Sequence, residues 1–118
     1  MAKETERIAV ASSDGIVVNN HFGHAAKFHI YEVCGDEIKY LEVRKVEPVC
    51  DGGTHDEKRL NENIEKIGDC RYLLVSRIGE GAAAAVEQKG ITPYELPGII
   101  GESIHQLLNY IKIKKLFE

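Results

Sequence analysis

The sequence predicts a single α/β domain with a mixed five-stranded sheet and helices on its faces. The first half of the chain alternates short β-rich runs with turns, which favours antiparallel neighbours. The second half alternates apolar runs with helical stripes in the order αβαβα, which favours parallel strands. A length of 118 residues fits one domain. We expect that domain to span residues 1–118, with residues 1–6 as a flexible leader.

The N-terminal half supplies the antiparallel strands. β-Branched and aromatic residues concentrate in four runs, at residues 7–12, 16–18, 27–33 and 38–46. Asp14-Gly15 and Gly35-Asp36 are turn dipeptides between successive runs.

The C-terminal half supplies the helices and the parallel strands. Thr54 and Glu57 have the spacing of a capping box, and the helix behind them is expected to close at Gly68. The remaining elements are a strand at 72–75, a helix at 82–86 closed by Gly90, a strand at 91–96 and a helix at 102–116. The strand at 72–75 is continuously apolar, which is typical of a strand covered on both faces.

Composition and charge narrow the class of function. The formal net charge is −4, and the one basic cluster, Lys112, Lys114 and Lys115, is interpreted as the solvated end of the last helix. We therefore expect no nucleic-acid partner. No apolar run reaches the ~18 residues that span a bilayer, and the charged N-terminus lacks a signal peptide, so we expect a cytoplasmic protein without a membrane partner. Three cysteines in that compartment predict thiols or metal ligands rather than disulfides.

The first candidate site is the pair His21-x-x-His24. Imidazole suits iron, zinc and copper, and a tight turn at Gly23 could aim both rings at one point. Two ligands do not complete a zinc site, for which three or four protein ligands are usual. The alternative is one capping or core histidine and one surface histidine.

The second candidate is the loop from Cys50 to His55. A thiolate and an imidazole flank Gly52 and Gly53 at the entrance to a helix, where free N–H groups favour anions. This loop could hold a soft metal, an anion or an anionic metal–sulfur cluster. The alternative is a flexible surface loop with a buried cysteine.

The third candidate is the segment from Arg77 to Gly81, between a strand and a helix. In open α/β sheets ligands bind beyond the carboxyl ends of strands, and the glycines at 79 and 81 permit contact with an anion. Ordinary turn chemistry is the alternative. Four further residues are interpreted as packing or surface residues, namely His29, Cys34, Cys70 and His105.

Several of these segments together resemble a known family. They are Ile8–Ala11, the sequence His21-Phe22-Gly23-His24-Ala25, the aromatic strand Phe28–Val33 and the later Leu74–Gly79. The chain resembles the dinitrogenase iron–molybdenum cofactor biosynthesis family, of the NifX type that also forms the C-terminal domain of NifB. The resemblance extends from about Arg7 to about Tyr110.

The resemblance implies a ribonuclease-H-like fold and a protein that binds, carries or stores an iron–sulfur or molybdenum-containing cluster. It makes His21 and His24 the best metal ligands and ranks Cys50 and His55 second. Gly23, Gly52, Gly53, Arg77 and Gly79 are then the expected cofactor-binding positions beside them. The implied partners are the cluster itself and cluster-assembly or acceptor proteins. No enzymatic activity is expected, and the sequence does not set the oligomeric state.

Two other functions use the same features. A regulatory module that binds zinc or a small ligand would need the same histidines and the same loop. A ribonuclease-H-like nuclease would need carboxylates on its first and fourth strands to hold two metal ions. Counted without the short run at 16–18, those strands read Ile8–Ala11 and Tyr72–Val75 and contain no acid, which disfavours the nuclease.

Overall fold

One mixed sheet organises the molecule. The computed structural model describes residues 5–51, 54–55 and 57–117, and for residues 50–51 and 54–55 it describes the backbone alone. The order across the sheet is β4 (Glu37–Lys45), β3 (Lys27–Cys34), β1 (Thr5–Ala11), β7 (Tyr72–Val75) and β8 (Thr92–Glu95). β1 pairs antiparallel with β3, and β3 with β4, whereas β1, β7 and β8 run parallel. The predicted mixed five-stranded sheet is confirmed.

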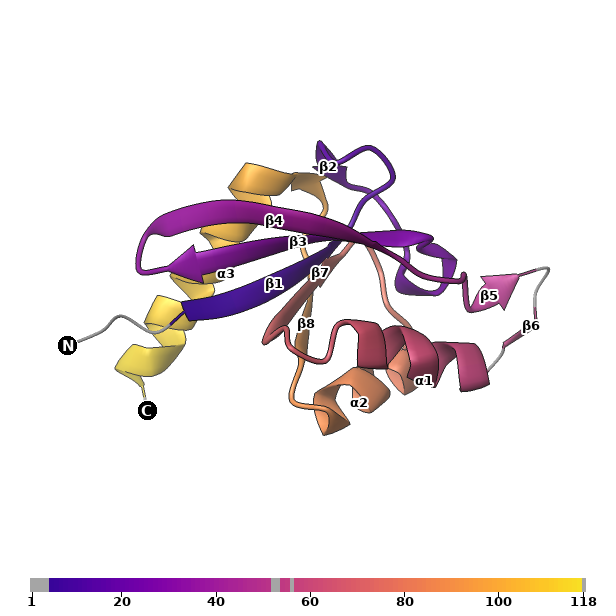
Figure 1. The fold of residues 1–118 in the computed structure, drawn as a ribbon. Helices are drawn as coiled ribbons and strands as arrows, with labels where there is room; N and C mark the ends of the chain where they lie inside the picture. The colour runs from indigo at the N-terminus through magenta and orange to yellow at the C-terminus, as the bar shows by residue number, and fades with distance from the viewer. Residues whose placement is uncertain (1–4, 52–53, 56, 118) are drawn as a thin grey trace.

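Helices cover both faces of this sheet, as the sequence predicts. α1 (Glu57–Lys66) and α2 (Glu80–Gln88) lie on one side, and α3 (Ile100–Leu116) lies on the other (Figure 1). Each side has its own apolar core. The α1–α2 side includes Ala9, Phe28, Leu60, Ile64, Leu73 and Val86. The α3 side includes Ile8, Val10, Leu74, Ile100, Ile104 and Leu107. No helix among residues 5–51, 54–55 and 57–117 is long and apolar enough to cross a bilayer.

The two central strands are apolar because both of their faces are covered. Residues 8–11 of β1 and all four residues of β7 are buried. Alternate side chains of β1 enter opposite cores, so that Ala9 faces α1 and α2 while Val10 faces α3.

The start of the first strand and the pairing of the second differ from the sequence prediction. β1 begins at Thr5, so residues 5–6 belong to the sheet and not to a leader; residues 1–4 lie outside the described residues. The run at 16–18 forms β2 (Val17–Val18), which pairs with β9 (Gly98–Ile99) in a separate two-stranded sheet. Asp14 explains this departure, because its carboxylate accepts the N–H groups of Ile16 and Val17 and turns the chain away from β1.

The ends of α1 also differ from expectation. Thr54 lies in β6 (Thr54–His55), which pairs with β5 (Cys50–Asp51), and the helix begins at Glu57, so the predicted Thr54 cap is wrong. Gly68 does not adopt a left-handed conformation, because a tight turn with a hydrogen bond from the Gly68 N–H to the Glu65 carbonyl closes this end. Gly90 does close α2 as predicted, with a φ of 83°.

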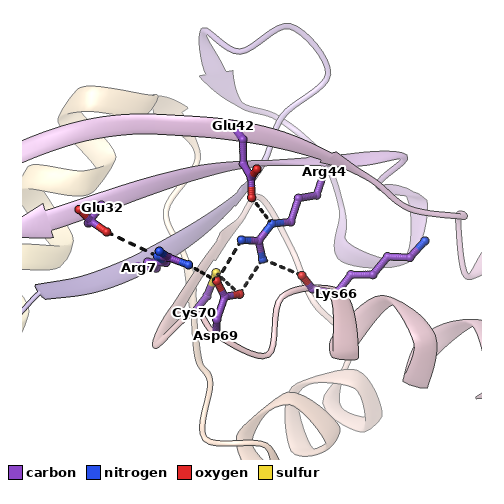
Figure 2. A network of polar contacts seen from close by, with 7 residues as sticks. All are labelled: Arg7, Glu32, Glu42, Arg44, Lys66, Asp69 and Cys70. Carbon is purple, nitrogen blue, oxygen red and sulfur yellow. Dashed lines mark hydrogen bonds and ion pairs between the residues drawn. The ribbon is translucent and has the colours of Figure 1, made fainter.

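An ionic network fastens the edge of the sheet to its centre (Figure 2). Arg44 of β4 donates from two nitrogens to the Asp69 carboxylate, at 2.6 and 2.9 Å, and also donates to the Lys66 carbonyl at the end of α1. Arg7 of β1 reaches the same carboxylate at 2.6 Å. Asp69 therefore links β1, β4 and the segment between α1 and β7.

Replacing Asp69 by asparagine should lower the free energy of unfolding by about 1 kcal/mol at pH 7, a value reduced for solvent screening. The hydrogen bonds from Arg44, more than those from Arg7, hold the pKa of Asp69 well below its ordinary range. The ionised Asp69 side chain therefore makes its full contribution to the free energy of unfolding above the unfolded-state pKa of about 4. That contribution is lost as the pH falls below this value. Urea unfolding of wild type and Asp69→Asn should give a difference in the free energy of unfolding that is constant from pH 7 down to about pH 4. The difference should become smaller between about pH 4 and pH 3.

Asp36→Asn is the matched control, because Asp36 pairs with Lys112 through side chains that are 87% and 65% exposed. This variant should unfold like wild type. Equal stabilities for the Asp69 variant and wild type at pH 7 would contradict a structural role for the network.

Candidate functional site

A backbone bridge places the histidine turn at the carboxyl end of β7. The Phe22 N–H donates to the Arg77 carbonyl at 2.9 Å, and the Ser76 N–H donates to the Asn20 carbonyl at 3.0 Å. His21 and Arg77 thereby form an isolated parallel bridge. Two candidate segments that lie more than fifty residues apart in the sequence are thus adjacent.

The turn itself is a short 3-10 helix, η1 (Phe22–His24), anchored by the buried Phe22 side chain. His21 precedes it, and its Nδ1 accepts the Gly23 N–H at 3.1 Å. The His21 and His24 rings meet edge to face, with centroids 5.3 Å apart and planes at 71°. Two imidazoles bound to one tetrahedral ion would have centroids about 5 Å apart, so the observed spacing fits two ligands of one metal ion.

The hydrogen bond from the Gly23 N–H determines which nitrogen of the neutral His21 ring carries the proton. An Nδ1 atom that accepts a hydrogen bond carries no proton, so the neutral ring carries its proton on Nε2. In this form His21 presents an N–H donor through Nε2. Coordination of a metal by Nε2 requires the ring proton to move to Nδ1, so coordination by either nitrogen ends the hydrogen bond that Nδ1 accepts from Gly23.

A pocket of about 260 Å³ opens beside this turn, and its lining is mostly apolar. It brings together three residues that the sequence predicted, His21, Gly23 and Gly79. The rest of its wall comes from Phe22, Val49, Leu60, Gly81 and Ala82. His24 and Arg77, also predicted, do not line this pocket; Arg77 joins the site through its backbone and its side chain is exposed.

The N-terminus of α2 forms one side of the pocket. Gly79 precedes the helix and provides no side-chain cap, so the first-turn N–H groups are open to a ligand. A Cβ atom built on Gly79 or Gly81 meets nothing within 4 Å, which leaves room for a ligand to approach the backbone.

Glu95 is a residue of this site that sequence reasoning missed. It ends β8, and its carboxylate accepts the Ile78 N–H at 2.9 Å, which fixes the segment that leads into α2. No sequence pattern indicates this role, because the two residues meet only through the parallel pairing of β7 and β8.

The second predicted loop lies next to the first. The backbones of Cys50 and His55 are direct partners in the β5–β6 pair, and β5 lies against η1. Gly52 and Gly53 lie outside the described residues, as do the side chains of Cys50 and His55. Their roles as ligands stay predictions. In the part of the chain that the structure describes, no cluster of three His, Cys, Asp or Glu side chains could hold a metal ion.

The other two cysteines lie away from this pocket. Cys34 pairs with Thr5 at the far end of β1, whereas the histidine turn follows the opposite end, where Ala11 pairs with Phe28. Cys70 precedes β7 and is buried; burial, followed by the charge of Asp69, raises its pKa to about 12. The Cys70 thiol therefore stays protonated and is a poor ligand at neutral pH.

Comparisons with known proteins identify the family to which the chain belongs. The family described as dinitrogenase iron-molybdenum cofactor matches residues 5–111. The FeMo cofactor biosynthesis protein NifB of Frankia alni is 36% identical over 107 residues, which cover 88% of this chain and 21% of that protein. The chain thus spans about a fifth of the length of this relative.

Solved structures with low sequence identity share the fold. An NMR structure of a Thermotoga protein, provisionally assigned as NifB, has a TM-score of 0.61, 23% identity and 88% coverage of both chains. A crystal structure of a Methanocaldococcus jannaschii protein, provisionally assigned as a dinitrogenase, has a TM-score of 0.58, 15% identity and 90% coverage of both chains.

The geometry at His21 makes a spectroscopic prediction. Because Nδ1 accepts the Gly23 N–H, the neutral ring should carry its proton on Nε2, and long-range ¹H–¹⁵N correlation spectra of the imidazole should show this tautomer. Gly23→Pro removes the donor and should remove the preference. A ring protonated on Nδ1 in the wild-type protein would contradict the hydrogen bond.

Proposed function

Because the chain belongs to the dinitrogenase iron–molybdenum cofactor family, we propose that it binds and carries a metal–sulfur cluster of the iron–sulfur or molybdenum-containing type. The observation that carries this proposal is the pocket where His21 and Gly23 meet the N-terminus of α2. Family membership supports a role in iron–molybdenum cofactor biosynthesis.

The chemistry of the pocket suits a soft, anionic cargo. The sulfides of a cluster accept hydrogen bonds, and such bonds tune the cluster as well as hold it. The first-turn N–H groups of α2 are donors without a side-chain cap, and the helix dipole favours negative charge at this end. The apolar walls, among them Val49 and Leu60, would exclude water from one side of the cluster.

His21 and His24 are the metal ligands in this proposal, and Cys50 and His55 complete the set from the neighbouring loop. The adjacency of β5 and η1 supports this combination. A carrier must release its cargo, so a few histidine and cysteine ligands suit it better than a closed four-cysteine site. Gly52 and Gly53 would contribute N–H donors to the same cluster.

The proposal includes a ribonuclease-H-like fold without nuclease chemistry. The order β4-β3-β1-β7-β8, with β3 antiparallel to the other four, supports that fold assignment. β1 and β7 are neighbours, and their buried segments, Ile8–Ala11 and Tyr72–Val75, offer no carboxylate for two-metal catalysis. We propose a binding protein rather than an enzyme, which would exchange its cluster with assembly or acceptor proteins in the cytoplasm.

Anaerobic reconstitution tests the proposal. Wild-type protein incubated with an iron–sulfur or thiomolybdate cluster should retain it through gel filtration, with charge-transfer absorption and stoichiometric metal. His21→Ala should reduce retention by about tenfold or more, because it removes a ligand or a sulfide donor. His24→Ala should reduce it as well.

His105→Ala is the matched control, because His105 is an exposed histidine on α3, the helix that covers the other face of the sheet. It should bind like wild type. Undiminished binding by both His21 and His24 variants would overturn the site assignment. Stoichiometric zinc uptake without cluster uptake would overturn cluster carriage and favour the regulatory zinc module.

A further inference from the structure

A second hollow lies at the opposite end of the sheet, where β7 and β8 begin. Arg71 immediately precedes β7 and Thr92 opens β8, and the Thr92 N–H donates to the Arg71 carbonyl at 2.9 Å. Tyr72 and Thr92 are register partners in the parallel pair. The last turns of α3 close the hollow from the other side.

Cationic and hydroxyl-bearing side chains dominate its wall. We call this pocket the basic hollow, and the residues that define it are Arg71, Tyr72, Thr92, Tyr94, Lys114 and Lys115. Its volume is about 110 Å³. A second, more open pocket of about 510 Å³ is also lined by Arg71, Thr92 and Lys114, and Glu87 forms part of its wall.

The cations of the basic hollow differ from Arg7, Arg44 and Lys112 in their ion pairing. Arg7, Arg44 and Lys112 each form an ion pair with a carboxylate. Within residues 5–51, 54–55 and 57–117, neither Arg71 nor Lys114 nor Lys115 has a carboxylate within ion-pair distance. Like charges that share a hollow repel one another, and an anion bound between them would relieve that repulsion.

The hydroxyl groups add neutral donors to these charges. Burial, followed by the charge of the neighbouring Glu6 carboxylate, raises the pKa of Tyr72, so its hydroxyl stays protonated at neutral pH, and Glu6 competes with a bound anion for that donor. Thr92 and Tyr94 carry two more hydroxyl groups in the same wall. A group with three terminal oxygens can use such a set of donors more fully than a carboxylate with two.

We propose that the basic hollow binds a phosphate group, held by Arg71, Lys114 and Lys115 and by the hydroxyl groups between them. The group could be free phosphate or the phosphate of a nucleotide. The nearly parallel rings of Tyr94 and Tyr110, with centroids 6.3 Å apart, provide an aromatic surface beside the hollow on which a base could stack.

This site is independent of the proposed cluster site. The pocket at His21 lies beyond the carboxyl end of β7, whereas the basic hollow lies at its amino end. No residue lines both. A phosphate site would therefore persist if the chain carried no cluster.

Titration of the ¹⁵N-labelled protein at low ionic strength tests the proposal, with orthophosphate, adenosine monophosphate and citrate as probes. Phosphate should shift the amides of Arg71, Thr92 and Lys114. Arg71→Gln and Lys114→Gln should each weaken binding by about fivefold. Lys39→Gln, which removes an exposed cation from the β4 edge, is the matched control and should bind like wild type.

Several outcomes would overturn the phosphate site: no shift at the basic hollow, shifts confined to the Gly79–Gly81 amides, or citrate binding as tightly as phosphate. Tighter binding of adenosine monophosphate with a shift at Tyr110 would support the site and identify a nucleotide as the source. Equal binding of both phosphates would support the site with free phosphate as the source. Because Arg71 and Lys114 are exposed, both variants should fold, and Lys115→Gln provides a second test in case one does not.

Discussion

The position of β1 between β3 and β7 is the constraint on which the rest of the structure depends. β1 is hydrogen-bonded on both sides and buried on both faces, so its core residues must be apolar throughout. Because β1 and β7 are parallel, the chain leaves both strands at the same edge of the sheet. The segment after β1 therefore meets the segment after β7, and the bridge between His21 and Arg77 follows from this arrangement.

The same arrangement gives the two ends of the sheet different chemistry. At the carboxyl ends of the strands, a helix N-terminus and a histidine turn surround an apolar pocket. At the amino ends lie the basic hollow and the two described thiols, Cys34 and Cys70. The Asp69 network spans both ends, because Asp69 precedes β7 whereas Arg44 leaves β4 at the register of Phe28 and Ala11 (Figure 2).

At His21, the hydrogen bond from Gly23 and the proposed coordination of a metal involve the same imidazole ring. The bond from Gly23 to Nδ1 shapes the turn, and it is worth roughly 1 kcal/mol, as a single hydrogen bond usually is. Ligation through Nδ1 would break this bond directly, and ligation through Nε2 would break it by moving the ring proton to Nδ1. This cost makes the ligand weaker than an unconstrained imidazole, which is compatible with the proposed role of a carrier that releases its cluster.

The sequence by itself determined the mixed sheet, the helix order and the histidine turn, because β-rich runs, helical stripes and turn glycines are local signals. Tertiary structure alone decided that Val17–Val18 pairs with Gly98–Ile99, since the Asp14 turn and the partner strand both act at a distance from that run. It also selected His21, Gly23 and Gly79 for one pocket, left His24 and Arg77 off its wall, and added Glu95. These outcomes depend on which strands are parallel neighbours, and no spacing within a single segment encodes that.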